Sequence, residues 1–216
     1  MVAAIYIPAI RETIKQNEIG NATPYALSYA RLDKSGASFG VMQGDTNVSL
    51  LARDTLEKVL TAASAPPAAM ARIMAALSQP LPGGDPLSAA DAKLANAALA
   101  SPKGRALVDA MDAQLLAVVL EGVDGCIAAA GQRKVGFAPR ALLYTAPWIN
   151  MTGPPALLKA WLAGSPVFGL APPPPPQVGP EAMESYLQAT AYFRQHPKNF
   201  LHYRQCVEIG AKLLPA

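Results

Sequence analysis

Three carboxyl groups lie close together in the N-terminal part of the chain, within EIGNATPYALSYARLDKSGASFGVMQGD, residues 18 to 45. They belong to Glu18, Asp33 and Asp45, and serines and glycines surround them. Two carboxyl groups in different environments can act as general acid and general base, because burial keeps one protonated while a polar setting keeps the other ionised. The stretch therefore favours proton-transfer chemistry, provided that the fold brings two of the three together.

Glu18 is predicted to lie at the C-terminal end of a helix that spans residues 6 to 18. Apolar residues recur at helical spacing along this segment, at Ile7, Ile10 and Ile14. Gly20 follows at the position where a helix commonly stops. A partly apolar pocket at this helix end would raise the pKa of Glu18 and keep the carboxyl protonated near neutral pH.

A small β-hairpin is predicted after this helix, over residues 26 to 43. The segments ALSYARLD and SFGVMQ alternate or run apolar, and Lys34-Ser35-Gly36 between them has the composition of a turn. Asp33 stands beside that turn. Asp45 follows the hairpin, where it or Thr46 would also suit the cap of the next helix.

The rest of the chain predicts helices separated by proline- and glycine-rich breakers. The expected helices span residues 48–63, 66–78, 88–99, 103–130, 138–149, 154–163, 181–195 and 198–213. The segment APPPPPQVGP, residues 171 to 180, predicts a stiff polyproline II spacer that acts as an internal linker. We therefore expect a single α+β domain over residues 1–216, mostly helical, with one small sheet.

Composition narrows the classes of partner. The formal charge of +3 and pI of about 8.9 are mildly basic, and the basic residues are scattered. A dedicated nucleic-acid surface would show clustered basic residues, so no nucleic-acid partner is expected. Cys126 and Cys206 stand far apart without a CxxC pattern, which predicts no zinc site and favours two half-buried thiols, with a disulfide left open.

We expect neither a signal peptide nor a membrane span. The N-terminal MVAAIYIPAIRETIK lacks a basic region before its short apolar run, so we expect synthesis in the cytoplasm without a signal peptide. The longest apolar block carries acidic residues at Asp109, Asp112, Glu121 and Asp124. These charges argue against stable membrane insertion and predict that residues 103–130 form the most buried helix, in the core.

Two separated segments resemble the lysozyme superfamily. NEIG followed by DKSGASFGVMQ is similar to the phage-type lysozyme and endolysin stretch in which an aspartate at the hairpin turn precedes a hydroxyl residue and an apolar-Gly-apolar strand. The string GASFGVMQ also resembles the GA-x-G-L-M-Q signature of soluble lytic transglycosylases. Farther along, APWINMTGPPALLKAWL, residues 146 to 162, is similar to the segment that lines the far side of the cleft in phage lysozymes.

The resemblance implies a lysozyme-like fold and a peptidoglycan-degrading muramidase. Cleavage of a glycosidic bond needs one protonated carboxyl group, and a second carboxylate that activates water or stabilises the developing positive charge. Glu18 is the expected acid. The spacing to Ser38, whose hydroxyl would hold the attacking water, favours Asp33 as the second group, and Asp45 is the alternative.

Four further residues are expected to bind substrate. The amide of Gln43, expected on the last residue of a strand, would hydrogen-bond an N-acetyl or hydroxyl group of a sugar. Tyr29 and Trp148 would stack on sugar rings. The resemblance places Asn150 on the far wall of the cleft.

The expected partner is therefore peptidoglycan or a related N-acetylated glycan. We expect a monomer that uses no cofactor and no metal. It would act on the cell wall after release or secretion by another system. Two alternatives stay open. A lytic transglycosylase would need only the single glutamate, and a non-catalytic glycan-binding or phage-structural module would keep the fold without the chemistry.

Overall fold

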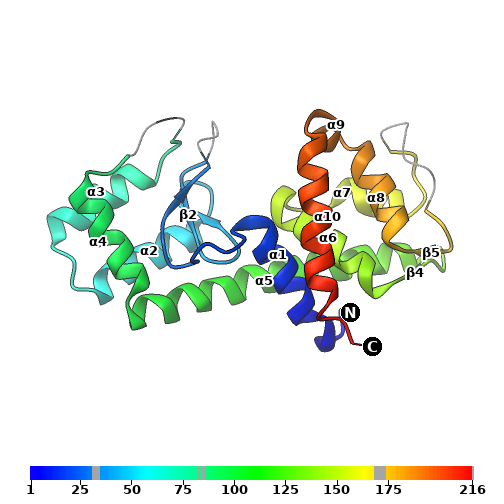
Figure 1. Cartoon of the computed structure of the whole chain (residues 1–216), viewed down its shortest axis with the longest axis horizontal. Coiled ribbons are helices and arrows are strands. Elements are labelled where there is room, and N and C mark those ends of the chain that lie inside the picture. Colours follow the sequence, from blue (N-terminus) through cyan, green and yellow to red (C-terminus); the bar gives the residue numbers. More distant parts are fainter. Residues whose placement is uncertain (31–34, 82, 84–85, 168–173, 216) are drawn as a thin grey trace. The chain divides into compact units, whose positions relative to one another are not determined.

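The computed structural model describes residues 1–30, 35–81, 83, 86–167 and 174–215 (Figure 1). The chain divides into two compact units, where the sequence predicts one domain. Unit 1 comprises Met1–Gly20 with Leu116–Ala216, and unit 2 comprises Asn21–Leu115. The long helix α5, Pro102–Gly131, contributes its first half to unit 2 and its second half to unit 1.

Unit 1 contains most of the helices; they lie close to their predicted bounds except for the predicted helix 181–195, which is divided into two at Thr190. Besides the second half of α5 they are η1 (Ala4–Tyr6), α1 (Ile7–Glu18), α6 (Pro139–Thr152), α7 (Ala156–Leu162), α8 (Pro180–Ala189), α9 (Ala191–Gln195) and α10 (Pro197–Ala211). Proline stands in the first turn of α1, α6, α8 and α10. Its missing N–H costs nothing there and its fixed φ suits the helix start, so these prolines set where the helices begin.

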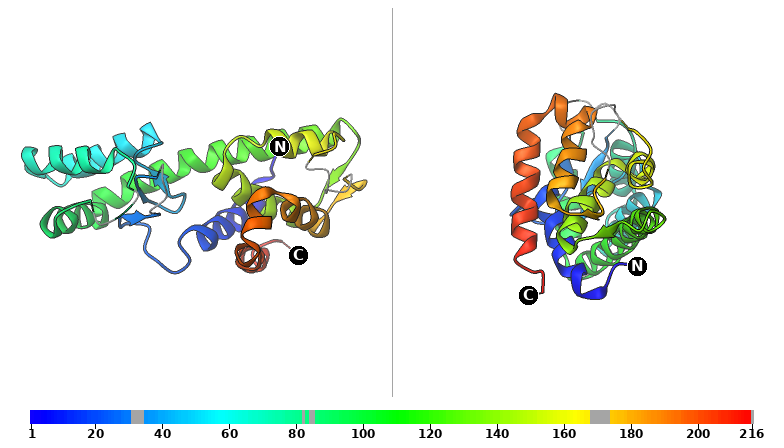
Figure 2. Two further views of the ribbon diagram at one scale, coloured as in Figure 1. Left: turned by 90° about the horizontal axis from the view of Figure 1, so that it is seen from above. Right: turned by 90° about the vertical axis from the view of Figure 1, so that its right-hand side faces the viewer.

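Helix α1, which ends at Glu18, packs against α10 and α6, and Figures 1 and 2 show α1 beside α10. Gly210 allows the close approach of α10, because a Cβ there would stand 2.8 Å from the carbonyl oxygen of Ala9. On the facing side, Thr13 donates its hydroxyl to that same carbonyl at 2.8 Å. The packing of α10 therefore fixes the position of α1, the helix that carries Glu18.

The most buried helix is α6, in contrast to the prediction for residues 103–130. Every residue of α6 from 141 to 149 is buried. In α5 the predicted bounds are confirmed, but most buried positions are three or four residues apart, and Val118 is 65% exposed. Helix α5 is also long and apolar enough to cross a membrane by length and composition, a property that it shares with core helices of soluble proteins.

Unit 2 holds an antiparallel sheet of three short strands, where the sequence predicts a two-stranded hairpin. The order is β1 (Ser28–Tyr29), β2 (Ala37–Phe39), β3 (Gly44–Asp45), and the pairings place Ser28 opposite Ser38 and Ser38 opposite Asp45. The helices of unit 2 are α2 (Leu50–Ala62), α3 (Pro67–Leu77), α4 (Ala89–Ala100) and the first half of α5. Ala37 and Phe39 enter the apolar core that these helices form.

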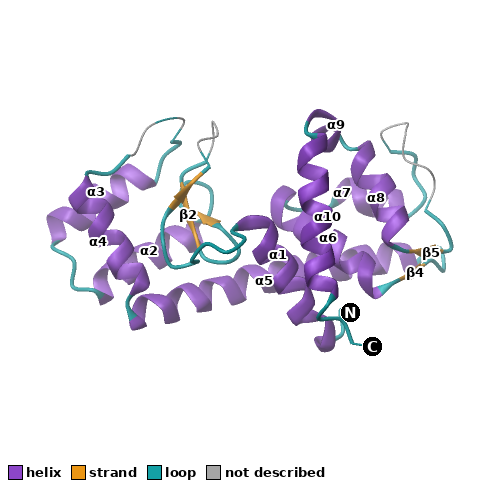
Figure 3. Ribbon diagram, viewed as in Figure 1, coloured by secondary structure: helices purple, strands orange, loops and turns teal. Residues whose placement is uncertain are grey.

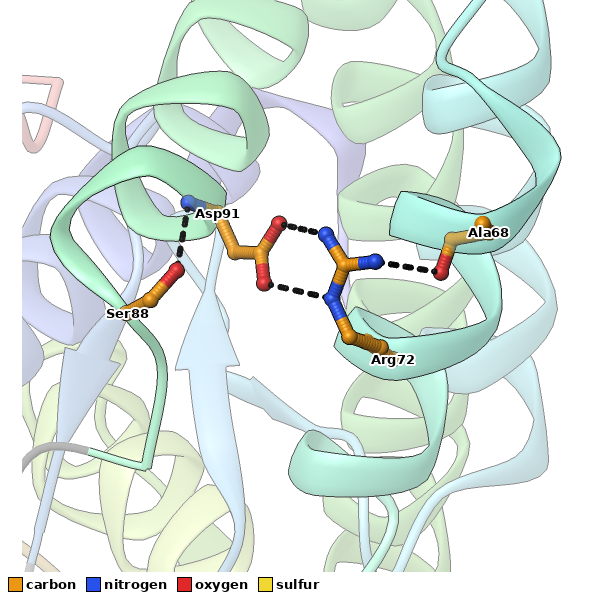
Figure 4. A network of polar contacts seen from close by, with 4 residues as sticks. All are labelled: Ala68, Arg72, Ser88 and Asp91. Atoms are coloured by element: carbon orange, nitrogen blue, oxygen red, sulfur yellow. Dashed lines mark hydrogen bonds and ion pairs between the residues drawn. The ribbon is translucent and has the colours of Figure 1, made fainter.

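A bidentate ion pair joins α3 to α4 in unit 2 (Figure 4). Arg72 donates from Nη2 to Oδ1 of Asp91 at 2.8 Å and from Nε to Oδ2 at 3.1 Å. Ser88 caps α4 by accepting from the backbone N–H of Asp91 at 3.1 Å. The hydrogen bond from Arg72 lowers the pKa of Asp91. These contacts serve packing between the two helices.

A second, parallel sheet in unit 1 corrects the expectation of a single sheet. It pairs β4 (Gly136–Phe137) with β5 (Gln177–Val178). Strand β5 lies inside the predicted polyproline spacer, whose residues 171–173 are outside the described part of the chain. Figure 3 shows how far helices outweigh strands, which confirms a mostly helical α+β protein.

Candidate active site

Glu18 is the last residue of α1, as the sequence predicts. The helix ends there because Ile19 leaves the helical conformation while its N–H still bonds to the carbonyl of Lys15. Gly20 then adopts φ +55°, a left-handed conformation that glycine reaches without strain. The turn ends α1 directly after Glu18.

A pocket of about 310 Å³ surrounds Glu18 inside unit 1. Aromatic and polar side chains from α9 and α10 form much of its wall, among them Tyr192, Phe193, Tyr203, Asn199 and His202. Such a wall excludes water from part of the carboxyl group while leaving polar groups near it. The pocket provides the partly apolar setting that the sequence argument required for an acid.

Two amides hold the Glu18 carboxyl. Asn150 donates from Nδ2 to Oε1 at 3.0 Å, and Asn17 donates to the same oxygen at 3.2 Å. Burial raises the pKa of Glu18 above the usual value of a glutamate, and these two hydrogen bonds offset part of the rise. A carboxyl with a raised pKa, in a pocket and held by neutral donors, has the properties of a general acid.

Asn150 comes from the last turn of α6, 132 residues away along the chain from Glu18. Gly153, which has φ +76°, caps the C-terminal end of the helix. The sequence placed Asn150 on the cleft wall as a substrate-binding residue. Its amide bonds Glu18 directly, so we describe it as a positioning residue for the acid.

Ser38 lies in the middle of the three-stranded sheet of unit 2. Because its neighbours Ala37 and Phe39 face the core, strand alternation places Ser38 on the opposite face. The residue is 7% exposed. Its proposed role in holding a water stays a prediction.

Asp45 is engaged as a structural acceptor. Both carboxylate oxygens accept from the backbone N–H of Gly36 at 3.0 Å, and Oδ1 also accepts from the N–H groups of Asn47 at 2.8 Å and Val48 at 3.3 Å. It is not the cap of α2, since Ser49 fills that position. The side chain thus fastens β3 to the segment before β2, which weakens its candidacy as the second catalytic carboxylate.

Gln43 and Tyr29 lie differently from the predictions. Gln43 is in a turn beyond β2, with φ +50°, and both ends of its amide are used inside unit 2. Its Oε1 accepts from the hydroxyl of Ser28 at 2.6 Å, and its Nε2 donates to the carbonyl of Gly40 at 2.9 Å. Tyr29 packs against the apolar core of unit 2, so neither side chain is a free sugar-binding group.

Asp112 of α5 organises the turn that Gln43 occupies, a role that sequence reasoning missed. It is buried and accepts from the backbone N–H groups of Val41 at 2.7 Å and Met42 at 3.0 Å. Gly40, at φ +83°, leaves the space, because a Cβ there would stand 2.5 Å from Oδ1 of Asp112. The Asp112 carboxylate, which in the sequence argues against a membrane span, therefore anchors the GVMQ segment.

Trp148 is 8% exposed and stacks inside unit 1 rather than presenting an open ring. Its ring lies 5.6 Å from that of Phe193 and 6.4 Å from that of Tyr192, centroid to centroid. Trp148 also lines a second pocket of unit 1. Its predicted role in stacking on a sugar ring stays a prediction.

The structure brings Glu18 and Asn150 together, and both belong to unit 1. Ser38, Gln43 and Asp45 belong to unit 2. Asp33 lies outside the described residues. The separation between Glu18 and a second carboxyl group stays a prediction.

Sequence reasoning missed the pocket residues Tyr192, Tyr203 and His202. The signal available was the aromatic content of AYFRQHPKNFLHYRQC, residues 191 to 206, which is unusual for the chain. Cys206 and Cys126 are free and fully buried, not half-buried as predicted. Burial raises the pKa of Cys206 to about 11, which disfavours a thiolate beside His202 at 3.6 Å.

Comparison of the chain with protein-family models, with curated proteins and with solved structures finds no match.

Proposed function

We propose that the protein is a lysozyme-like glycoside hydrolase, a muramidase that cleaves the glycan strand of peptidoglycan with Glu18 as general acid. The observation that carries the proposal is the Glu18 carboxyl itself. It lies in a pocket of unit 1 with a raised pKa, held by the amide of Asn150 at 3.0 Å.

Each feature of this carboxyl suits the first step of glycoside cleavage. The leaving oxygen needs a proton as the bond to the anomeric carbon breaks, and a carboxyl that stays protonated near neutral pH can supply it. The donated hydrogen bonds from Asn150 and Asn17 converge on Oε1. They leave Oε2 as the natural carrier of that proton.

A lytic transglycosylase is the second candidate, and the state of Asp45 favours it. That carboxylate is held by backbone amides at 2.8–3.3 Å. Among the described residues that line the Glu18 pocket, Glu18 is the one carboxylate. A single glutamate suffices when a hydroxyl of the sugar attacks its own anomeric carbon, because Glu18 would first donate the proton and then take one from that hydroxyl.

The test is lysis of purified cell walls by Glu18→Gln. An amide of the same shape cannot donate the proton, so activity should fall by about 100-fold or more. Glu12→Gln is the matched control, because Glu12 lies on the same helix and contacts Lys15 and Gln16. Retained lysis in a folded Glu18→Gln variant would remove Glu18 as the acid.

Product analysis then separates the two enzymes. A reducing-end sugar indicates a hydrolase, and an anhydro sugar indicates a transglycosylase. A wild-type protein that binds walls without cleaving them would point instead to a non-catalytic module.

A further inference from the structure

His202 lines the same pocket of unit 1 as Glu18, and the proton donation proposed for Glu18 does not use it. The pocket holds about 310 Å³. One water takes up about 30 Å³ of liquid volume, so several waters fit between the walls. A reaction that needs an acid, a water and a base therefore has room in this pocket.

The packing of α1 against α10 explains why the two side chains share a pocket. Thr13 of α1 lies beside Gly210 of α10. At 1.5 Å per residue, Glu18 is about 7.5 Å farther along α1 than Thr13, and His202 is about 12 Å back along α10 from Gly210. Since both residues line one pocket, the two helices run antiparallel, and the end of α1 lies beside the turn of α10 that carries His202.

Two tyrosines of the pocket wall are committed to other hydrogen bonds. The hydroxyl of Tyr203 donates to the carbonyl of Tyr144 at 2.5 Å, and burial raises the pKa of Tyr203 well above its usual range. The hydroxyl of Tyr192, on α9, accepts from Asn199 at 3.0 Å. The imidazole is the side chain that changes charge between about pH 5 and 8. The acid aside, His202 is therefore the wall residue suited to exchange a proton near neutral pH, among those that the structure describes.

Cys206, one turn farther along α10, contacts the His202 ring. Its Sγ lies 3.6 Å from Nε2 of His202. Burial raises the pKa of Cys206 to about 11, and the charge of Glu18 adds to the rise, so the thiol stays protonated and the carboxyl lies within electrostatic reach of it. In the tautomer whose Nε2–H points at the sulfur, Nδ1 is the nitrogen left to accept a proton.

We propose that His202 is the general base of the Glu18 site, where it takes a proton from the water that attacks the anomeric carbon. The inference rests on the proposed function, since it needs the acid step at Glu18. It adds a base within unit 1, so that the reaction needs neither Asp33 nor Asp45 as its second group.

The step balances in atoms and electrons. As the bond from the anomeric carbon to the leaving oxygen breaks, that oxygen keeps the electron pair and takes the proton of Glu18. The water oxygen forms the new bond to the anomeric carbon, and one water proton passes to Nδ1 of His202. The proton then returns from the imidazolium to the Glu18 carboxylate through water in the pocket. The product is a reducing-end sugar, which separates this scheme from a transglycosylase even where both aspartates are dispensable.

The first test compares the two histidines of the chain in lysis of purified cell walls. His202→Ala removes the base and should lower turnover at pH 7 by about 100-fold, the lower scale for a positioned base. His196→Ala is the matched control, because His196 contacts the ring of Tyr192 but does not line the pocket. Its turnover should stay near that of the wild type, with each rate normalised to the folded fraction by circular dichroism.

Two further readouts separate a base from a residue that only supports α10. Wild-type lysis should rise with pH as the imidazole loses its proton and fall as Glu18 loses its own, so His202→Ala should lose the acid limb and keep the alkaline limb. Added imidazole should restore part of the turnover of His202→Ala, because it can take the proton in place of the missing ring. It should not restore Glu18→Gln, which lacks the acid.

The outcomes distinguish the inference from the proposed function. Wild-type turnover in His202→Ala, a uniform loss that leaves both limbs in place, or an anhydro product would overturn the inference. Loss of lysis in Glu18→Gln together with wild-type lysis in His202→Ala would remove the base while leaving the proposed function intact. A wild-type protein that does not cleave walls would remove the proposed function and the inference with it.

Discussion

Glu18 in unit 1 and Asp45 in unit 2 are both carboxylates at the end of a short regular element, and their surroundings are opposite in kind. Glu18 accepts from two side-chain amides and faces a pocket. Asp45 accepts from three backbone N–H groups, two from the turn that follows it and one from Gly36 before β2. A carboxylate that satisfies backbone donors serves the fold, whereas one placed in a pocket among aromatic rings can serve as an acid.

The largest effect that tests this comparison concerns the second catalytic group. If Asp33 is that group, Asp33→Asn should lower turnover by about 100-fold or more, and Asp45→Asn should lower the turnover of the folded protein much less. Wall-lysis rates, each normalised to the folded fraction by circular dichroism, decide it. The reverse ranking would transfer the role to Asp45, and near-wild-type turnover in both would favour the transglycosylase mechanism.

Asp45→Ala should reveal a structural role through stability. Removal of the side chain leaves the N–H groups of Gly36 and Asn47 without their acceptor, and a lost hydrogen bond of this kind costs about 1–2 kcal/mol. Urea unfolding measures the free energy. Asp54→Ala, on the exposed face of α2, is the control and should change it little; equal losses in the two variants would contradict the assigned role.

Local patterns predicted the helices well because proline, glycine and apolar spacing act within a few residues. The start of α6 at Pro139 and the stop of α1 before Gly20 are examples. The strands that the sequence did not predict depend on pairing between distant segments. Strands β4 and β5 have two residues each, and their paired residues Gly136 and Gln177 are 41 positions apart. Such pairs leave no periodic trace in the sequence.

The same division holds for the candidate site. Glu18 and Asn150 were both named from the sequence, because a resemblance to known motifs covers each segment. Their contact could not be derived, since it depends on how α1 packs against α6. A local feature, the extended backbone of Thr190, divides the predicted helix 181–195 into α8 and α9. Tyr192 follows this break and lines both pockets.

Glu18→Gln should change stability in the direction opposite to Asp45→Ala. Because the pKa of Glu18 is raised in the folded protein, the folded state favours the protonated form. Wild-type stability is therefore lost as pH rises through the folded pKa, where the carboxylate becomes charged in its pocket. The glutamine variant lacks this titration and should be the more stable protein above that pKa. Urea unfolding at a series of pH values measures the free energy of unfolding of both proteins. If the wild type became more stable relative to the variant as pH rises, the argument from burial of Glu18 would be contradicted.

The smallest effect concerns Asn150, and it bears on whether the amide positions the acid or merely lies near it. The hydrogen bond from Asn150 lowers the pKa of Glu18, against the larger rise that burial causes. Asn150→Ala should therefore raise that pKa further. Since the acid works only while protonated, lysis declines as pH rises through the pKa, so the alkaline limb of the pH profile should move to higher pH in this variant.

Asn17→Ala is the matched control, because Asn17 donates to the same oxygen at the longer distance of 3.2 Å and contributes less to lowering the pKa. Its limb should move in the same direction by a smaller amount. An alkaline limb that stays in place in Asn150→Ala, with activity uniformly reduced, would show that the amide supports the fold of α6 without tuning the acid.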